Sequence, residues 1–480
     1  MIESEIKKKF ADFLIGNVER ETTVKQYVSK LSILGKWFID NEIAPINFNI
    51  WLDTKDIDTI NNKLKTKYKE LWLSTNKREK NWLSSPWNKW IDFNNNHQLD
   101  FISVEMEDFI YTKFYESAIE SNLFFSKSLV LRFISTLITK PFVILTGLSG
   151  SGKTKLAQAF AMWICENENQ YCIVPVGADW TNREPLLGFP NALKSGEYVK
   201  PDNRVLDLII EATKLENQHK PYFLILDEMN LSHVERYFAD FLSVMESHKK
   251  ISLHTGTENW GDVPSEINLP SNLFIVGTVN IDETTYMFSP KVLDRASVIE
   301  FRVTENEMKN YLRNKKSLNL KPLEATGVTM ASGFVEIANN ETIEPENAID
   351  LNNALIDFFS ELKKTGAEFG FRSASEILRF AGVINKIERA NWTLPQIIDA
   401  AIMQKLLPKV HGSRRKLEPV LKTLGTLCLI DGQNMDDFIS AKTEINFADA
   451  TKIKYPLSLE KILRMYQSLI SNGFTSYAEA

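Results

Sequence analysis

The stretch Gly147-Leu-Ser-Gly-Ser-Gly-Lys-Thr154 decides the fold of this 480-residue chain. It has every fixed position of the phosphate-binding pattern G-x-x-x-x-G-K-[ST]. The apolar run Phe142-Val-Ile-Leu145 before it predicts a buried strand, and the segment 155–163 after it predicts a helix. A turn of this kind binds anions, because its backbone N–H groups and the helix dipole both favour negative charge there. The stretch therefore predicts a P-loop that holds the phosphates of a nucleotide.

The residues of this loop have separate expected roles. Its three glycines let the backbone approach the phosphates closely, which a Cβ would prevent. Lys153 is expected to reach the β- and γ-phosphates, and the Thr154 hydroxyl is expected to ligate Mg²⁺. The full cofactor-binding set consists of Gly147, Ser149, Gly150, Ser151, Gly152, Lys153 and Thr154. An ordinary Gly/Ser connection between a strand and a helix is the alternative interpretation.

A pair of carboxylates follows a second apolar run. The run Tyr222-Phe-Leu-Ile-Leu226 is typical of a strand buried on both faces of a parallel sheet, and Asp227 and Glu228 come directly after it. The carboxyl ends of such strands face the crevice where ligands bind. Asp227 is therefore predicted to hold Mg²⁺ opposite Thr154, and Glu228 to polarise the water that attacks the γ-phosphate. Without the P-loop, the same pair would be interpreted as a helix N-cap.

A third apolar run ends in a polar residue that belongs to the same prediction. Leu273-Phe-Ile-Val-Gly-Thr-Val-Asn280 predicts a strand, and Asn280 stands at its end. In that place its amide is able to contact the γ-phosphate or the attacking water. A lone Asn after a strand is otherwise a common turn residue.

Composition and length exclude several classes of protein. The hydrophobic content of 44% and the charged content of 25% are ordinary for a soluble globular protein. No apolar stretch approaches the roughly 20 residues that cross a bilayer, and the N-terminus has no signal-peptide pattern. The three cysteines lack a C-x-x-C spacing, which fits a reducing compartment. We therefore expect a cytoplasmic protein without a membrane partner, and the net charge of −6 argues against non-specific coating of nucleic acid.

The periodicity of the chain predicts three domains. Residues 1–100 are expected to form a helical N-terminal domain. Residues 101–305 are expected to form an α/β core, in which a helical lead-in from about 110 precedes the alternation of strand and helix at 140–305 that is typical of a parallel sheet. Turn residues at 188–198 are expected to form a hairpin insertion in this core. Residues 306–480 are expected to form an irregular connector and a helical lid. The predicted fold class is α/β: a P-loop NTPase core with flanking helices, a C-terminal helical lid and an N-terminal all-α domain.

The N-terminal segment 1–100 contains six of the ten tryptophans, interleaved with lysines. Basic residues among aromatic ones suit a nucleic-acid surface. A small helical domain with a Trp-rich core and a solvated lysine face fits the same composition. The segment also resembles, weakly, the helical core-binding units of tyrosine recombinases, so a DNA-binding or specificity role stays open beside the structural interpretation.

Taken together, the motifs resemble the AAA+ superfamily, and most closely the McrB-like NTPases of modification-dependent (type IV) restriction systems. The resemblance extends over roughly residues 125–430. The segments that carry it are 145–154, 226–238, 277–295, 369–379 and 406–416. It implies an AAA+ core, hydrolysis of GTP or ATP with Mg²⁺, and assembly of the chain into a ring, expected to be a hexamer.

The resemblance also implies how the attacking water is placed. Asn280 matches the residue called sensor 1, which acts beside the catalytic Glu228. In the family's element M-N-T-A-D-R-S, a second acidic residue helps to place the water, and Glu283 occupies that position here. The chain departs from the family at the next residue, where Thr284 replaces the Arg.

Two arginines take catalytic roles by the same resemblance. Arg295 lies where the family has an arginine finger, which completes the site of a neighbouring subunit and supplies charge to the transition state. A surface salt bridge is the alternative interpretation for Arg295. Arg372 matches the sensor 2 arginine of the helical lid, and Arg379, on the same predicted helix, is its rival.

The function that the resemblance implies is that of an NTP-driven motor subunit in a McrBC-like antiviral DNA restriction system. Such a subunit binds DNA, with modified DNA among the candidates, and drives a separate McrC-like nuclease subunit. The chain itself has no endonuclease pattern such as PD-(D/E)xK. A MoxR-like AAA+ chaperone that remodels a protein client is the alternative. The basic cluster at 405–416 is open to three interpretations, which are contact with DNA, contact with another subunit, or a solvated helix end.

Overall fold

The computed structural model of the chain consists of two compact units, Met1–Glu105 and Met106–Ala480. The structure describes residues 30–31, 34, 36–39, 60, 63–64, 68, 87–91 and 108–480, except 248, 282–285, 287, 314–317, 389–391, 441–444 and 479. The predicted N-terminal all-α domain therefore lies mostly outside the described residues. The division of the chain at residues 100 and 305 also stays a prediction.

Three tryptophans of the first unit are described, and two of them, Trp87 and Trp90, are buried, whereas Trp37 is half-buried. Trp87 is 2% exposed and Trp90 is fully buried. Trp87 meets Phe38 edge to face, with ring centroids 5.0 Å apart. Such pairs belong to packed cores. These two side chains therefore contribute to a core and not to an exposed surface on which bases stack.

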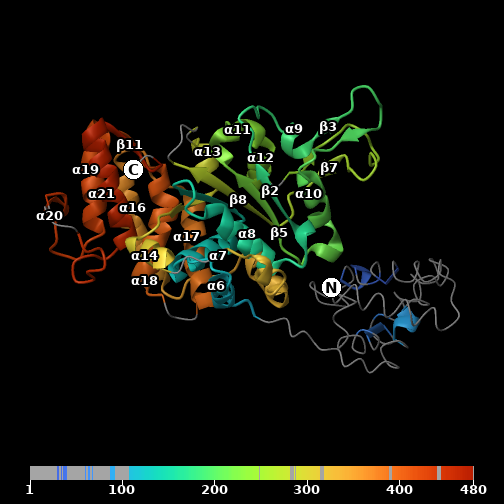
Figure 1. Cartoon of the computed structure of the whole chain (residues 1–480), viewed down its shortest axis with the longest axis horizontal. Coiled ribbons are helices and arrows are strands. Elements are labelled where there is room, and N and C mark those ends of the chain that lie inside the picture. Colours follow the sequence, from blue (N-terminus) through green and yellow to red (C-terminus); the bar gives the residue numbers. More distant parts are fainter. Residues whose placement is uncertain are drawn as a thin grey trace. The chain divides into compact units, whose positions relative to one another are not determined.

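The second unit is built on a five-stranded parallel sheet (Figure 1). The strands, in their order across the sheet, are β2 (Tyr171–Pro175), β5 (Tyr222–Asp227), β8 (Leu273–Asn280), β1 (Phe142–Gly147) and β9 (Ser297–Phe301). Gly147 at the end of β1 is paired with Asn280 on one side and with Phe301 on the other. Because the strands are parallel, their carboxyl ends meet at one edge of the sheet, where ligands bind in open α/β folds.

Helices cover both faces of this sheet. Val143 and Leu145 of β1 belong to the core on one face, and Phe142 and Ile144 belong to the core on the other. The first core includes α6 (Tyr111–Glu120), α7 (Lys127–Thr139), α8 (Lys153–Ile164) and α15 (Ala331–Asn339). The second includes α10 (Val205–Thr213) and α12 (Ala239–Ser247). This arrangement confirms the predicted α/β class, a parallel sheet with helices on both faces.

Short elements join the main strands and helices. The strands β3 (Phe189–Pro190) and β4 (Tyr198–Val199) form the hairpin predicted at 188–198, which projects from the sheet in Figure 1. A second hairpin consists of β6 (Ile251–Ser252) and β7 (Glu266–Ile267). The short helices are α9 (Glu184–Leu187), α11 (Val234–Tyr237), α13 (Pro290–Leu293) and α14 (Glu305–Arg313). No helix among the described residues is long and apolar enough to cross a bilayer.

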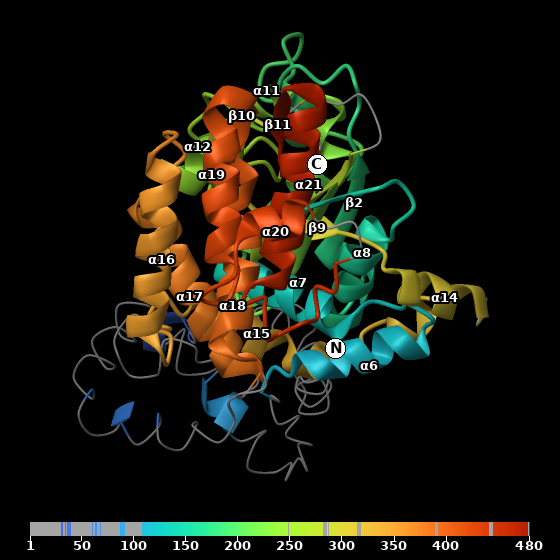
Figure 2. The same ribbon diagram turned by 90° about the vertical axis from the view of Figure 1, so that its left-hand side faces the viewer.

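The C-terminal part of the chain is a helical domain whose core continues that of the second sheet face. Its helices are α16 (Ala348–Lys363), α17 (Phe371–Glu388), α18 (Leu394–Ala401), α19 (Arg414–Leu427), α20 (Met435–Ile439) and α21 (Pro456–Asn472). Figure 2 shows α16, α19 and α21 side by side. The strands β10 (His411–Ser413) and β11 (Phe474–Ser476) pair just before α19 and just after α21.

A buried ion cluster fastens α21 to the sheet. Glu300 on β9 has a side chain that is 7% exposed, and it accepts hydrogen bonds from Lys461 (2.8 Å) and Arg464 (2.7 Å) of α21. When one partner of such a cluster is removed, the remaining charge is left buried and uncompensated, which costs about 3–5 kcal/mol. The cluster therefore couples the helical domain tightly to the strand beside the P-loop strand.

The same helix is capped from outside by a buried carboxylate. Asp399 in α18 is 2% exposed, and it accepts the backbone N–H groups of Leu457 and Ser458, each at 2.8 Å. These are two of the N–H groups that the first turn of a helix cannot satisfy internally. Burial nevertheless raises the pKa of Asp399 to about 6.

We expect Asp399 to make the stability of the protein depend on pH. Its pKa in the folded state is above the value of about 3.9 in an unfolded chain, so the folded state binds its proton more tightly. The resulting stabilisation is complete below about pH 4 and is lost as pH rises through 6. Relative to Asp399→Asn, the wild-type free energy of unfolding should therefore fall by about 1–3 kcal/mol between pH 4 and pH 7. Urea unfolding of the wild type and of Asp399→Asn at pH 4 and pH 7 measures this difference. If the free energy of unfolding changes equally with pH in both proteins, Asp399 is not its cause.

Candidate nucleotide-binding site

The P-loop leaves β1 at Gly147 and enters α8 at Lys153. Gly150 and Gly152 have φ angles of 73° and 98°, in the left-handed region that glycine adopts without strain. At Gly147, an added Cβ would lie 2.4 Å from the carbonyl oxygen of Phe301. Glycine is therefore required at Gly147 by the neighbouring strand β9, and at the other two positions by the turn itself.

The inside of the loop has the groups that a phosphate needs. Lys153 is 4% exposed, and its ammonium donates to the carbonyl oxygens of Gly147 (2.8 Å) and Leu148 (2.7 Å). The Ser151 hydroxyl is buried and has no hydrogen-bond partner among the described groups. The loop opens on the N-terminus of α8, where the helix dipole favours an anion. The cradle thus combines a buried cation, an unsatisfied hydroxyl and a helix N-terminus.

The end of β5 brings Asp227 to the P-loop. Oδ1 of Asp227 accepts a hydrogen bond from the Thr154 hydroxyl at 2.7 Å and another from the Thr278 hydroxyl at 2.6 Å. Thr278 also accepts the backbone N–H of Glu228 at 3.1 Å. One buried threonine on β8 therefore fixes both carboxylate residues at the end of β5.

Glu228 and Asn280 are in direct contact. The Asn280 side-chain amide donates to Oε1 of Glu228 at 3.0 Å, so the ends of β5 and β8 are joined at the site. Glu228 also has a φ of 54°, which is uncommon for a residue with a side chain. Backbone conformations of this kind collect at functional sites, where the surrounding structure imposes them. The structure thus brings the predicted carboxylate and the predicted sensor together in one arrangement.

The oxygen ligands at this edge fit a magnesium ion. Mg²⁺ is usually held in proteins by one or two carboxylates together with phosphate oxygens and waters. The hydroxyl of Thr154 and the carboxylate of Asp227 lie 2.7 Å apart next to the phosphate cradle, and Oδ2 of Asp227 has no hydrogen bond within the described chain. Among the described residues, no group of three His, Cys, Asp or Glu side chains offers a metal site. A site that depends on the nucleotide for its other ligands is consistent with both observations.

Thr278 is the residue of this site that the sequence analysis missed. It is 1% exposed and stands two positions before Asn280 in β8. Alternate residues of a strand point to the same side, so both side chains face the end of β5. A lone hydroxyl inside the otherwise apolar run 273–279 was the available signal.

Thr278→Val is expected to weaken the response of hydrolysis to Mg²⁺. Valine keeps the shape of threonine, but it removes the hydrogen bonds that orient Asp227 and the Glu228 backbone. Loss of a group that orients a metal ligand typically lowers metal affinity about 10–100-fold. Titration of phosphate release with Mg²⁺ should show this shift, and Thr278→Ser should restore the wild-type curve. If the valine and serine variants titrate alike, the hydroxyl has no orienting role.

The two predicted catalytic arginines lie together on a single carboxylate. Arg295 is 9% exposed and donates to the carbonyl oxygens of Leu242 (2.7 Å) and Lys291 (2.8 Å), and it forms an ion pair with Glu246. Arg372 in α17 donates to the other oxygen of Glu246 at 3.0 Å. Burial lowers the pKa of Arg295, and the positive charge of Arg372 acts in the same direction. The carboxylate of Glu246, at the end of α12, thus pairs with two positively charged guanidinium groups, those of Arg295 and Arg372.

This arginine pair lies away from the P-loop of its own chain. Arg295 precedes β9, whose first residue Ser297 pairs with Val143 near the start of β1, whereas Phe301 pairs with Gly147 at its end. Four residues of strand span about 13 Å. The arginines therefore lie toward the amino end of the sheet, and the phosphate cradle lies at the carboxyl end.

Other candidates from the sequence occupy different places. Arg379, the rival to Arg372, donates to the backbone oxygens of Thr139, Ala338 and Asn340 and so acts as an anchor between segments. Residues 282–285 lie outside the described residues, so the prediction for Glu283 and Thr284 stays open.

The structure divides the predicted basic cluster at 405–416. Lys405 is 4% exposed and pairs with Glu376, and burial lowers its pKa to about 8. Lys409 pairs with Asp294 and Arg414 with Glu418. Within the described structure, the exposed basic side chains of this segment that have no ion-pair partner are His411, Arg415 and Lys416, and the His411 ring also hydrogen-bonds the Lys409 carbonyl oxygen at 3.1 Å. The exposed basic groups of this described segment therefore lie within residues 411–416.

Comparison with known proteins finds similarity over parts of the chain. Residues 322–474 match the family described as "Domain of unknown function (DUF8727)". Over 211 residues the chain is 23% identical to the type IV methyl-directed restriction enzyme EcoKMcrB subunit of Escherichia coli (strain K12). That match covers 41% of this chain and 43% of the subunit, so the chain matches less than half the length of this curated relative.

One solved structure of similar shape is a candidate ATPase from Cytophaga hutchinsonii. It has 15% sequence identity and a TM-score of 0.44, over 62% of this chain and 87% of that chain. A likeness of this extent does not bear on the activity or the partners of this chain.

Proposed function

We propose that the chain is a Mg²⁺-dependent nucleoside-triphosphate hydrolase of the AAA+ type, using GTP or ATP. We propose further that it is the motor subunit of a McrBC-like, cytoplasmic antiviral restriction system, which binds DNA and drives a separate McrC-like nuclease subunit. The first proposal rests on one observation: the carboxyl ends of strands β1, β5 and β8 lie next to one another at one edge of the sheet. There the Thr154 hydroxyl of the P-loop donates to Asp227 at 2.7 Å, and the Asn280 amide donates to Glu228 at 3.0 Å.

Each group of this edge has a part in hydrolysis by in-line attack of water on the γ-phosphate. Lys153 and the loop N–H groups bind the phosphates, and Thr154 and Asp227 would hold Mg²⁺, which neutralises charge as the bond to the leaving phosphate breaks. Glu228 accepts a proton from the attacking water. Asn280 donates to Glu228 and so holds its carboxylate at one angle. In this way the chain's own residues bind the phosphates, orient the carboxylate of Glu228 and remove a proton from the attacking water.

The position of the arginines supports a ring of copies of this chain. Arg295 and Arg372 lie toward the opposite end of the sheet from their own phosphate cradle. We therefore propose that both act on the nucleotide of a neighbouring copy, where their charge would stabilise the transition state. A head-to-tail contact of this kind closes into a ring when its rotation allows, expected here to be a hexamer. Because Arg295 is 9% exposed, its action in a neighbour requires release from Glu246.

The proposal of a restriction motor is supported by the similarity to the EcoKMcrB subunit, whose described role is that of a methyl-directed restriction enzyme subunit. Steady-state phosphate release from the purified full chain tests it. The rate should be measured with GTP and with ATP, each without DNA, with plain duplex and with methylated duplex of the same sequence.

We expect faster turnover with one nucleotide and a further increase with DNA. If the methylated duplex stimulates more than the plain one, the chain itself contributes to recognition of the modification. A rate that responds to no DNA would contradict the DNA-binding part of the proposal and would favour a chaperone acting on protein. Absence of hydrolysis with either nucleotide would contradict the proposal as a whole.

A further inference from the structure

One half-exposed carboxylate holds both of the arginines that are proposed to act on a neighbouring copy. Glu246 has a side chain that is 50% exposed. Its Oε2 pairs with Nη2 of Arg295, and its Oε1 accepts from Nη2 of Arg372 at 3.0 Å. The two guanidinium groups, one from the segment before β9 and one from α17, therefore converge on a single small anion.

The hold of Glu246 on these arginines is of a kind that another anion can replace. Nε and Nη1 of Arg295 donate to backbone oxygens at 2.7 and 2.8 Å, so its guanidinium keeps two acceptors when Glu246 moves away. Arg372 has a side chain that is 46% exposed. Ion pairs at this exposure contribute little, because water screens them and the side chains lose freedom in forming them. Exchange of the carboxylate for a more highly charged anion is therefore favourable.

The arginines belong to a cluster with more positive than negative charges. Glu376 pairs with both Lys140 and Lys405. Asp294, which directly precedes the first arginine, pairs with Lys409. The Asp294 backbone oxygen also accepts from both lysines of Glu376, each at 3.4 Å. Together with the two arginines and their shared glutamate, five cationic side chains are thus joined to three carboxylates, which leaves a net charge of +2.

The surplus of positive charge acts on the members of the cluster. Burial lowers the pKa of Lys140, and the positive charges of Arg372 and Arg295 act in the same direction. Burial also lowers the pKa of Lys405 to about 8, and the charges of Lys140 and Lys409 add to this effect. At pH 7 Lys405 therefore stays largely charged. A further anion is favourable at this end of the sheet, and it would reach the cluster at the half-exposed Arg372.

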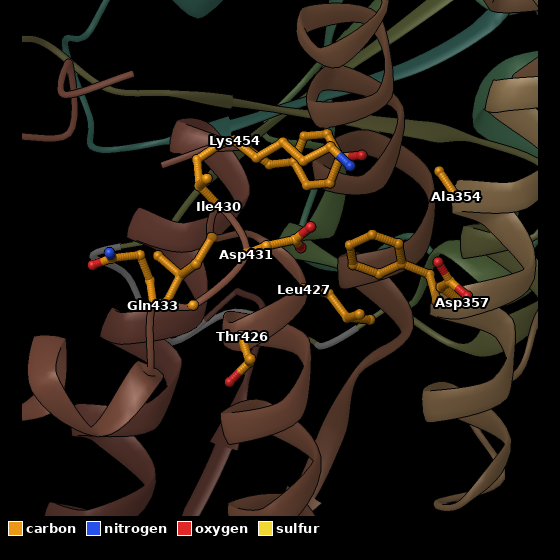
Figure 3. A pocket seen from close by; sticks show the side chains of 12 residues that line it. Ala354, Asp357, Thr426, Leu427, Ile430, Asp431, Gln433 and Lys454 are labelled. Atoms are coloured by element: carbon orange, nitrogen blue, oxygen red, sulfur yellow. The ribbon is translucent and has the colours of Figure 1, made fainter. Parts of the chain in front are cut away.

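The cavity of the helical domain is separate from this cluster. It has a volume of about 270 Å³ and is lined by α16, the end of α19 and the segment that leads into α21 (Figure 3). None of its lining residues belongs to the cluster or to the nucleotide site. Within the described structure, its exposed carboxylates Asp357 and Asp431 form no ion pair with the five cations.

We infer that Glu246 is an internal competitor for the nucleotide: in the free chain its carboxylate holds the place that a phosphate on a neighbouring copy takes on assembly. The inference rests on the proposed ring and names the group that controls it. A triphosphate has more negative charge than one carboxylate, and its oxygens suit the forked donors of arginine. Displacement of Glu246 would release Nη2 of both arginines together, and assembly would then depend on bound nucleotide. Glu246 is thus a positioning residue, because it acts through the arginines.

Sedimentation velocity of the full chain at a series of concentrations tests this inference without hydrolysis, when the nucleotide is an imido analogue of GTP or ATP. Glu246→Gln keeps the size of the side chain but removes its charge, so both arginines are released more easily. With the analogue bound, we expect the concentration of half-assembly to be about three- to tenfold lower than in the wild type. Without nucleotide we expect no such shift, because the competing phosphate is missing.

Three further variants assign the shift to the arginines. In an Arg372→Ala background the effect of Glu246→Gln should become smaller, since one of the two released groups is gone. Glu246→Asp keeps the charge and should lie between the wild type and the glutamine variant. Glu211→Gln is the matched control, because Glu211 is 44% exposed and pairs with Lys214 at the end of α10. It should assemble like the wild type, and thermal unfolding confirms that each variant is folded.

The outcomes separate this inference from the ring on which it rests. If the wild type assembles with nucleotide but Glu246→Gln does so at the same or a higher concentration, the inference is overturned and the ring stands. A shift of equal size without nucleotide, or in Glu211→Gln, overturns it as well, because exchange with phosphate is then not the cause. If the wild type does not assemble with either analogue, the proposed ring fails, and this inference fails with it.

Discussion

Glu228→Gln should bind nucleotide as the wild type does and lose hydrolysis, with kcat lower by about 10²–10⁴-fold. Glutamine keeps the size of the side chain and the oxygen that accepts from Asn280, so the local geometry persists. What it loses is the ability to accept a proton from the attacking water. The carboxylate is held at a fixed angle by Asn280, and its backbone by Thr278, so no other group within this arrangement is placed to replace it.

Two measurements on this variant separate binding from chemistry. Fluorescent nucleotide titration should give an unchanged dissociation constant, and single-turnover phosphate release should be slow. Lys153→Ala supplies the opposite pattern, since it removes the cation inside the P-loop and should abolish binding itself. Glu258→Gln, in an exposed loop, is the matched control and should leave both quantities unchanged. A Gln variant that hydrolyses at the normal rate would show that Glu228 is not the base.

The second large effect is expected at Arg295. Arg295→Ala should lower turnover in assembled protein by about a thousandfold or more, in keeping with the effect of an arginine finger. Because the site that loses its arginine belongs to a neighbour, an inactive Glu228→Gln subunit still donates a working arginine. In a 1:1 mixture of the two inactive variants, roughly a quarter of the interfaces should then be complete, and activity should return.

Controls for this experiment follow from the contacts of Arg295. Its removal deletes the hydrogen bonds of the guanidinium to the oxygens of Leu242 and Lys291, so thermal unfolding must show that the variant is folded. Arg372→Ala is the milder variant, because its side chain is 46% exposed and makes one ion pair. It should lower turnover and be rescued by the same partner. If folded variants fail to recover activity on mixing, the arginines do not act between subunits.

The sequence was sufficient for those parts of the site that local chemistry determines. The P-loop, the carboxylate pair and Asn280 all follow apolar runs, and a parallel sheet brings the ends of such runs to one edge. Thr278 was within reach of the same reasoning, because a hydroxyl at alternate spacing from Asn280 must face the same side. The predicted α/β class rests on these signals, and the structure confirms it.

The contacts that the sequence did not predict depend on long-range packing. Glu246 is an ordinary acidic residue near a helix end, and only the approach of α12 to α17 makes it the shared partner of two arginines. Lys405 and Lys409 looked like part of an exposed basic cluster, but the helical domain turns both toward acidic residues. No local pattern distinguishes a buried lysine with a partner from a solvated one.

The close fit of Gly147 against β9 has a mechanical consequence. The backbone of Phe301 blocks any Cβ at Gly147, and the next residue back along β9, Glu300, holds Lys461 and Arg464 of α21. Two adjacent residues of one strand thus touch the phosphate loop on one side and the helical domain on the other. Close-packed interiors transmit strain rather than absorb it. We therefore expect strand β9 to transmit displacement: when the loop shifts around a nucleotide, the orientation of the helical domain should change with it.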